Sequence, residues 1–130
     1  MNKLQFERYN ANPHNKKTGD CVIRAICTAL NETWAETYKA LFEIGFKKGA
    51  LPNERTTYKA YLKKKGYEME KQPRKANGTK YTINEFFEKE ADTKSTYIIH
   101  VRRHLTCIKK GVLLDTWNCG AYTMRNYWKL

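Results

Sequence analysis

The stretch 18–30 constrains the fold of this chain more than any other. Its first three residues, Thr-Gly-Asp, are of the types that end an extended segment and cap a helix. The residues that follow, CVIRAICTAL, carry apolar side chains at helical spacing, and only Arg24 and Thr28 interrupt them. The sequence therefore predicts a central, largely buried helix from about Cys21 to Leu30, with Cys21 in its first turn.

The position of Cys21 at a helix start favours chemistry at this thiol. Unsatisfied backbone N–H groups and the positive end of the helix dipole stabilise a thiolate there. The thiolate is the nucleophilic form of cysteine, so Cys21 is a candidate attacking group. The structural alternative is a small buried hydrophobe, which is how most free cysteines behave. A catalytic role therefore requires a base, and a group that orients the base, from elsewhere in the chain.

Length and composition predict one globular domain that spans residues 1–130. A chain of 130 residues with 41% hydrophobic content can bury a core of its own. It has no apolar run near the roughly 18 residues of a membrane span, and its N-terminus lacks the apolar core of a signal peptide. These features predict a cytoplasmic protein without membrane association, in which cysteines are thiols. The residues concerned are Cys21, Cys27, Cys107 and Cys119.

The chain is strongly basic, with 25 Lys and Arg against 13 Asp and Glu and a net charge of +12. Such a charge favours a polyanionic partner, nucleic acid above all. The lysines are scattered, however, as at 47–48, 63–65 and 71–80, and they belong to no recognisable nucleic-acid-binding module. A solvated, lysine-rich surface explains them as well, so the charge predicts weak nucleic-acid binding at most and does not decide the function.

Two further helices are predicted in the first half of the chain. Thr33 and Glu36 form a capping-box pattern that opens a helix ending near Gly45. Asn53 is expected to cap a third helix, which ends before Gly66. The residues that share one face of the first of these helices, and are expected in the core, are Trp34, Tyr38, Leu41 and Phe42.

Residues 1–17 are turn-rich and predict an irregular N-terminal arm.

The second half of the chain is expected to form the sheet. Residues 67–70 predict a short edge strand, and residues 72–80 predict a loop. A second capping box at Thr82 predicts a short helix. The β-branched and aromatic segments that predict strands are 96–101, 105–108, 112–117 and 122–128. The fold class is therefore α+β, with the helices first and an antiparallel sheet after them.

The predicted sheet supplies the base and the orienting group that Cys21 needs. His104 lies at the start of one strand, and Asp115 lies on the next strand of the same hairpin. His104 can take the thiol proton and later deliver it to a leaving group, while a carboxylate holds the ring. Taken singly, His104 is most simply a surface residue in a basic run, and Asp115 a strand-end residue paired with lysine or arginine. The order of the three residues favours one site over three coincidences.

The identity of the orienting residue depends on the turn of the hairpin. A two-residue turn at 110–111 places Asp115 diagonal to His104 on the same face of the sheet. A three-residue turn at 109–111 suits a left-handed Gly111 and places Asn118 there instead. We predict Asp115, because a carboxylate stabilises an imidazolium better than an amide does, with Asn118 as the alternative.

This order of residues resembles the papain-like cysteine peptidases, in which a helix-start cysteine is followed by a histidine and then an Asp or Asn from the sheet. The Gly-Asp-Cys that ends at Cys21 is similar to the Asp-Cys-Gly of bacteriocin-processing peptidase domains. Asp20, Cys21 and Ala25 partly match the Asp-Gly-x-Cys-x-x-x-Ala of ovarian-tumour-type deubiquitinases. The His-Leu-Thr from His104 resembles the start of the histidine strand, and the Asp-Thr-Trp from Asp115 resembles the Asn-Ser-Trp of papain.

The resemblance implies a papain-like thiol hydrolase that cleaves a peptide, isopeptide or other amide bond of a protein or peptide substrate, without a cofactor. Its catalytic residues would be Cys21, His104 and Asp115. Papain-like enzymes usually carry a Gln six residues before the cysteine as a donor to the oxyanion hole. That position is Asn15 here, and an Asn amide can donate the same hydrogen bond. The glycine that often follows the cysteine is Val22, which would narrow access to the thiol.

Two other uses of these residues compete with catalysis. His100, His104, Cys107 and Cys119 could gather around zinc, but no Cys-x-x-Cys or His-x-x-Glu-His pattern occurs, so no metal is predicted. The other alternative is a catalytically silent protein on the same scaffold that binds nucleic acid or a host factor, as would suit a small, basic, phage-encoded protein. Salt-dependent retention on DNA or RNA would favour that alternative.

Overall fold

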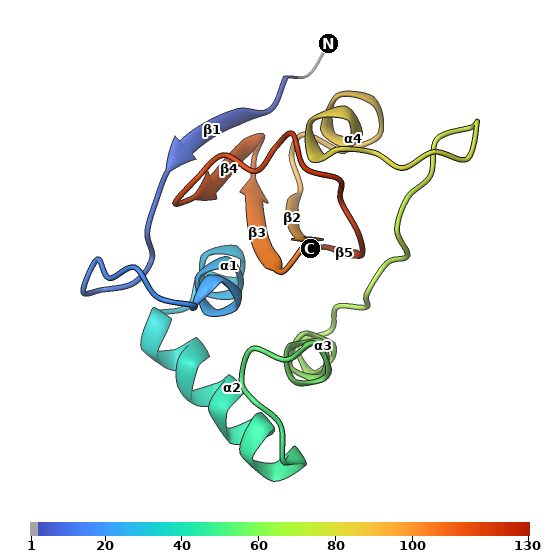
Figure 1. Ribbon diagram of the computed structural model, residues 1–130. Coiled ribbons are helices and arrows are strands. Elements are labelled where there is room, and N and C mark those ends of the chain that lie inside the picture. Colours follow the sequence, from blue (N-terminus) through green and yellow to red (C-terminus); the bar gives the residue numbers. More distant parts are fainter. Residues whose placement is uncertain (1–2) are drawn as a thin grey trace.

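The computed structural model describes residues 3–130, and over this range the chain forms four helices and a five-stranded, mostly antiparallel sheet (Figure 1). The helices are α1 (Cys21–Leu30), α2 (Trp34–Lys48), α3 (Arg55–Lys64) and α4 (Ile83–Lys89). The strands are β1 (Gln5–Arg8), β2 (Thr96–Val101), β3 (His104–Lys109), β4 (Val112–Asp115) and β5 (Tyr127–Lys129). The predicted α+β class, with the first helix packed on the sheet, is confirmed.

The strand order is β1-β4-β3-β2-β5, and among residues 3–130 β1 is the one strand that pairs in parallel, with Gln5 opposite Val112 of β4. The prediction of an irregular arm over residues 1–17 is therefore wrong for Gln5–Arg8; Met1 and Asn2 lie outside the described residues. All four side chains of β1 are exposed, so the strand shows none of the alternation that marks a half-buried strand in a sequence. This segment is a strand because its backbone pairs with β4.

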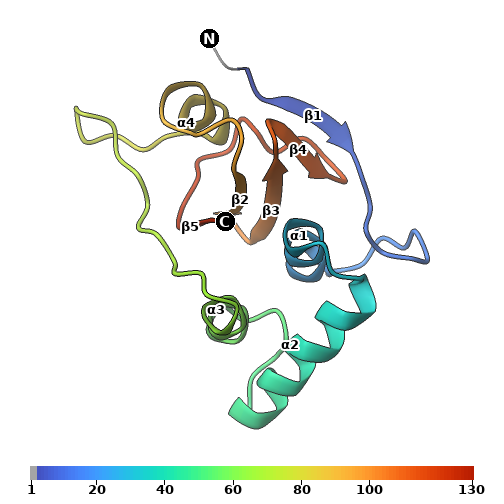
Figure 2. The ribbon, with the colours of Figure 1, turned by 180° about the vertical axis from the view of Figure 1, so that it is seen from behind.

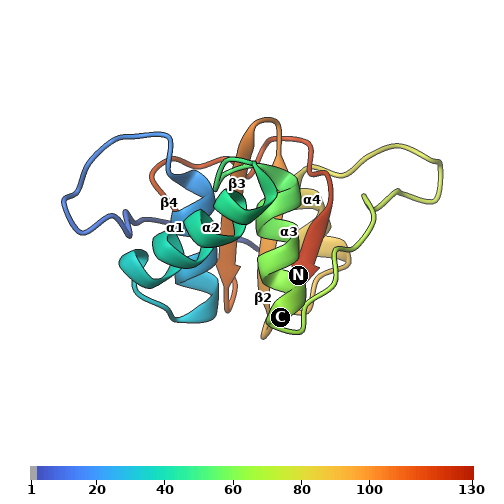
Figure 3. The same ribbon diagram turned by 90° about the horizontal axis from the view of Figure 1, so that it is seen from below.

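The sheet is covered on both faces (Figure 1 and Figure 2). Helices α1, α2 and α3 lie on one face, where Ile98, Leu105 and Trp128 of the sheet join their core. Helix α4 lies on the other face, where Tyr97 and Ile99 belong to a second core. Because successive side chains of a strand point to opposite faces, neighbouring residues of β2 belong to different cores. Seen from below, α1, α2 and α3 lie in front of the sheet (Figure 3), and α2 lies farther from the strands than α1 does (Figure 1).

Helix α2 extends beyond its predicted end. Its capping box at Thr33 and Glu36 is present, but the helix runs through Gly45 to Lys48 and ends at Gly49, whose φ of 69° is left-handed. Gly45 is buried against the returning chain, where a Cβ would lie only 2.6 Å from the carbonyl oxygen of Ala50. The glycine that predicted a helix end is thus a close-packing position, and Gly49 is the true C-cap.

Two of the three aromatic residues of α2 that the sequence predicted in the core are exposed. Leu41 is fully buried, whereas Tyr38 and Phe42 are 41% and 51% exposed. Tyr38 stacks on Trp34 and on Phe42, with ring centroids 5.1 and 6.2 Å apart, so an aromatic row runs from the half-buried Trp34 out to the exposed Phe42. The prediction of core positions is therefore confirmed for Leu41, holds in part for Trp34, and is wrong for Tyr38 and Phe42.

Several other boundaries differ from the prediction. The N-cap of α3 is Glu54 in place of Asn53. Residues 67–70 form no strand, and only Glu70 makes an isolated bridge, to Tyr127. The returning strand predicted over 122–128 is confined to Tyr127–Lys129, since the preceding segment makes turns and bridges. These short, partly exposed segments carry weak local signals, and their pairing depends on distant parts of the chain.

The hairpin between β3 and β4 has the two-residue turn. Lys109 pairs with Val112, and Lys110 and Gly111 both have positive φ values, of 49° and 80°. Two left-handed residues are the mark of a turn whose twist matches that of the flanking strands. The register that follows from this turn places Asp115 relative to His104.

Within residues 3–130 no helix has the length and apolar character needed to cross a membrane.

Candidate functional site

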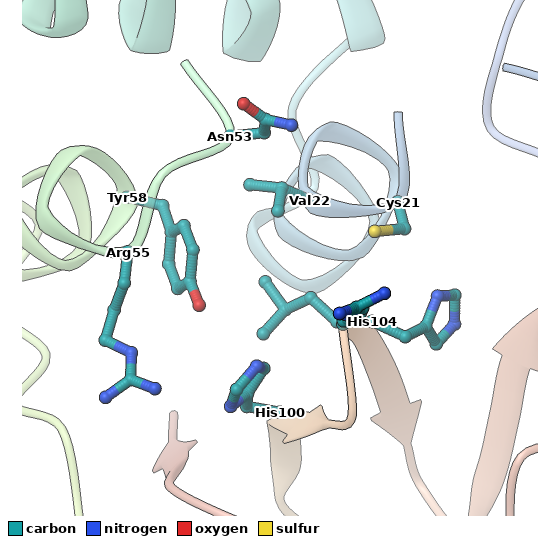
Figure 4. A pocket seen from close by; sticks show the side chains of 9 residues that line it. Cys21, Val22, Asn53, Arg55, Tyr58, His100 and His104 are labelled. Atoms are coloured by element: carbon teal, nitrogen blue, oxygen red, sulfur yellow. The ribbon is translucent and has the colours of Figure 1, made fainter. Parts of the chain in front are cut away.

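Cys21, His104 and Asp115 come together from three elements. Cys21 is the first residue of α1, His104 the first residue of β3, and Asp115 the last residue of β4. Helix α1 packs against β3, and β3 pairs with β4, so the three positions meet at one edge of the helix–sheet interface. Figure 4 shows Cys21 and His104 side by side, approaching from the helix and the strand.

His104 is held by Asp115. The His104 Nε2 atom lies 2.6 Å from Asp115 Oδ2, a short hydrogen bond between largely buried side chains. This contact leaves Nδ1 as the ring nitrogen for Cys21. Asn118, the alternative orienting residue, lies elsewhere, and its Oδ1 accepts a hydrogen bond from the backbone N–H of Gly120.

The carboxylate of Asp115 receives further hydrogen bonds. Thr106 Oγ1 donates to Oδ2 over 2.7 Å, and Thr106 is the residue that the hairpin register places opposite Asp115. Arg24 Nη1 donates to Oδ1 over 3.0 Å, and the Thr116 backbone N–H donates to the same oxygen over 2.7 Å. Asp115 is only 3% exposed, so these donors replace the water that its charge has lost.

Arg24 joins this carboxylate to a second buried one, and the sequence analysis missed that role. Its Nε donates to Asp20 Oδ1 over 2.9 Å. Asp20 Oδ2 in turn accepts from Asn12 Nδ2 and Trp34 Nε1, at 3.1 and 2.9 Å. Asp20 occupies the N-cap position of α1. Because its side chain binds Arg24, Asn12 and Trp34, it makes no capping hydrogen bond. The available signal was a charged residue inside an apolar helical stripe, because a buried charge requires a partner.

The pKa values of the three residues shift in the directions of an ion pair. Burial alone would raise the pKa of the Cys21 thiol, but hydrogen bonds from the His104 side chain and the Leu105 backbone bring it below its usual value. Burial alone would lower the pKa of His104, but hydrogen bonds with Asp115, Cys119 and Cys21 raise it to about 11. Burial opposes ionisation of Asp115 too, and its bonds to His104 and Thr106 still hold its pKa below the usual range. These directions favour a thiolate on Cys21 beside an imidazolium on His104.

Two more residues border the imidazole ring. Trp117 packs on His104 with ring centroids 5.0 Å apart. Cys119 is fully buried, and its Sγ lies 4.0 Å from Asp115 Oδ2. The two-residue turn predicts Trp117 opposite His104, and the zinc alternative grouped Cys119 with His104, but neither residue was predicted to take part in catalysis.

His104, Asp115 and Cys119 bring three potential metal ligands within 4.8 Å of one another. However, His104 Nε2 and Asp115 Oδ2 are 2.6 Å apart, which is the length of a direct hydrogen bond. Two ligands of a tetrahedral zinc ion with bonds of about 2.0 Å lie about 3.3 Å apart. A metal would thus have to displace the hydrogen bond that positions the ring. His100 and Cys107 of the zinc alternative do not belong to this cluster.

A pocket of about 340 Å³ opens beside Cys21 (Figure 4). The residues that line it are Cys21, Val22, Asn53, Arg55, Tyr58, His100, Arg103, His104 and Leu105. Asn15, the predicted oxyanion donor, does not line it. Asn15 lies on the exposed N-terminal arm, where its Oδ1 accepts a hydrogen bond from Asn10 Nδ2 over 3.5 Å. Asn53, just before α3, is the side-chain amide that borders the pocket.

No protein-family model matches this chain, and comparison with curated proteins and with solved structures finds no significant match. The chemistry of the site therefore rests on its own geometry.

Proposed function

We propose that this protein is a thiol hydrolase that cleaves a peptide, isopeptide or other amide bond, with Cys21 as nucleophile, His104 as general acid and base, and Asp115 as the orienting residue. One observation carries the proposal. The imidazole of His104 borders Cys21, and its Nε2 atom, on the side away from Cys21, lies 2.6 Å from the buried carboxylate of Asp115. A nucleophile, a base and a group that orients the base are the parts that covalent catalysis of acyl transfer requires.

In the proposed reaction the Cys21 thiolate attacks the carbonyl carbon of the substrate, forming a C–S bond while the carbonyl electron pair moves to oxygen. Collapse of this intermediate breaks the C–N bond, and the imidazolium of His104 gives its proton to the leaving amine. Water then attacks the thioester, and neutral His104 accepts its proton. Breakage of the C–S bond releases a carboxylic acid and regenerates the thiolate and the imidazolium. Every step is redox-neutral, and the protons pass through one ring.

The oxyanion needs donors close to Cys21. The first backbone N–H groups of a helix have no partner within the helix, and Cys21 begins α1. The positive end of the helix dipole adds to their effect on a developing negative charge. We assign this role to the start of α1, with the Asn53 amide at the border of the pocket as a second donor.

The fold supports this proposal through the placement of its parts. A buried helix carries the cysteine at its first turn, and adjacent antiparallel strands carry the histidine and the aspartate. This arrangement is the one that the resemblance to papain-like peptidases implies, and we propose membership of that superfamily on the same grounds.

Substitution of Cys21 tests the proposal. Purified protein is incubated with a mixed-sequence peptide library, and cleavage is followed by mass spectrometry. Cys21→Ala should lower the cleavage rate by a factor of roughly 10³ or more. Cys27→Ala, a control at a buried thiol of the same helix, should leave the rate unchanged. Cleavage that persists in Cys21→Ala would show that another group acts.

The silent scaffold is the rival outcome. It is supported if no peptide is cleaved, Cys21 reacts no faster than the other thiols, and the protein binds DNA or RNA at physiological salt. Such binding would weaken steeply with added salt, because it releases counterions. The net charge of +12 supports this rival, but it specifies no site.

A further inference from the structure

The pocket beside Cys21 is positively charged. Arg55 from the start of α3 and Arg103 from the β2–β3 turn both line it, together with His104, whose pKa is raised to about 11. Within the described part of the chain no Asp or Glu side chain lines this pocket. The two carboxylates behind the candidate site, Asp20 and Asp115, are buried and paired with Arg24. The positive charges of the pocket therefore have no acidic counterpart among its walls.

His100 adds a polar ring atom that lacks a partner and that can donate a hydrogen bond when it carries the ring proton. Its Nδ1 atom is buried and makes no hydrogen bond. Figure 4 shows the ring on the floor of the pocket, near the side chains of Arg55 and Tyr58. Burial lowers the pKa of His100 to about 4, and the charges of Arg55, Arg125 and His104 act in the same direction. A buried polar atom without a partner carries a free-energy cost that a ligand atom can remove.

Arg103 occupies a costly backbone position. Its φ of 53° lies in the left-handed region, in a two-residue turn where Val101 pairs with His104. A left-handed conformation costs a residue with a Cβ roughly 1 kcal/mol or more, and glycine avoids this cost. The chain nevertheless places a long cationic side chain there, next to the catalytic candidate His104. Strain of this kind gathers at functional sites.

We propose that this pocket recognises a carboxylate, so that the enzyme prefers peptide substrates with an acidic side chain or a free carboxyl group close to the scissile amide. The inference rests on the proposed function and names the substrate class of the same site. Arg55 and Arg103 supply the charge, and His100 supplies a neutral hydrogen bond. An arginine guanidinium suits this role, because its planar donors match the two oxygens of a carboxylate.

A pair of alkylating reagents tests the inference without a known substrate. Iodoacetate and iodoacetamide both form a C–S bond with a thiolate and release iodide, but only iodoacetate carries a carboxylate next to the reacting carbon. The ratio of their rates at Cys21 therefore measures how the pocket treats a nearby negative charge. We expect Arg55→Gln and Arg103→Gln each to lower the iodoacetate-to-iodoacetamide ratio by roughly three- to tenfold.

Two further variants control for a general effect of surface charge and for misfolding. Lys64→Gln removes one positive charge from the exposed far end of α3, and it should leave the ratio unchanged. Arg103→Gly suits the left-handed backbone, so it should fold at least as well as the parent chain and still lower the ratio.

The outcomes separate the two proposals. A ratio that is unchanged in both arginine variants, or that falls equally in Lys64→Gln, overturns carboxylate recognition and leaves the hydrolase proposal standing. A Cys21 that reacts with neither reagent faster than the buried thiols overturns both.

Discussion

Helix α1 and strand β3 each begin with a residue of the candidate site and carry a buried core cysteine a few residues further along. Helix α1 begins with Cys21 and continues to Cys27, while β3 begins with His104 and continues to Cys107. Burial raises the pKa of Cys27 to about 11 and that of Cys107 to about 12. Partial burial acts on Cys21 in the same direction, but hydrogen bonds from His104 and Leu105 reverse the shift. The comparison shows that the partners of a thiol, and not the element that carries it, determine whether it ionises.

The largest expected effect comes from removing the carboxylate that holds the reactive end together. Asp115→Ala leaves His104 buried without its partner and removes one of the two carboxylates that pair with Arg24, so we expect a loss of about 3–5 kcal/mol in the free energy of unfolding. Chemical denaturation measures it. Glu43→Ala breaks the exposed ion pair with Lys47 and should cost less than about 1 kcal/mol. Equal costs in the two variants would contradict the buried network.

The next effect is a difference in thiol reactivity within the native protein. At neutral pH iodoacetamide should label Cys21 more than about a hundredfold faster than Cys27 or Cys107, since only a thiolate reacts and each pKa unit changes its population tenfold. Timed labelling and peptide mass spectrometry give the rates. Earlier labelling of Cys27 or Cys107 would show that the two ends of α1 and β3 do not differ in this way.

Removing the imidazole should make the two ends more alike. In His104→Ala the pKa of Cys21 should rise, because burial then acts with less opposition. We expect its labelling rate at pH 7 to fall by about tenfold or more, and the pH of half-maximal rate to move upward. Trp117→Leu, which alters the packing on the ring but keeps the ring, serves as the control. An unchanged pH profile in His104→Ala would mean that the ring does not stabilise the thiolate.

The smallest effect is on acid stability. The pKa of Asp115 is held below its usual value of 3.8, so the unfolded chain binds more protons than the native one just below that pH. The contribution of Asp115 is present above pH 3.8 and is lost as the pH falls through its native pKa. The parent chain should therefore lose stability more steeply in that range than Asp115→Asn, by at most about 1.4 kcal/mol per pH unit. Denaturation at several pH values compares the slopes, and parallel curves would contradict the assignment.

Local sequence signals predicted the elements whose ends are fixed by neighbouring residues. The apolar spacing from Cys21 to Leu30 gave α1 its bounds, and the capping boxes at Thr33 and Thr82 gave α2 and α4 their starts. These signals depend on contacts within one turn of helix, which any chain of that sequence can make. The position of Cys21 in the first turn of α1 could be predicted for the same reason, whereas Asp115 was predicted inside a strand over residues 112–117 and is the last residue of β4.

Tertiary structure decided which of these residues meet. The turn chemistry of Gly111 mildly favoured Asn118, yet the observed two-residue turn places Asp115 against His104. Strand β1 exists through its pairing with β4, about a hundred residues away in the sequence. Arg24, an interruption in an apolar stripe, became the bond between two buried carboxylates. Spacing along a chain records local free energies, whereas register, strand pairing and the partner of a buried charge depend on contacts that exist only after distant segments have packed together.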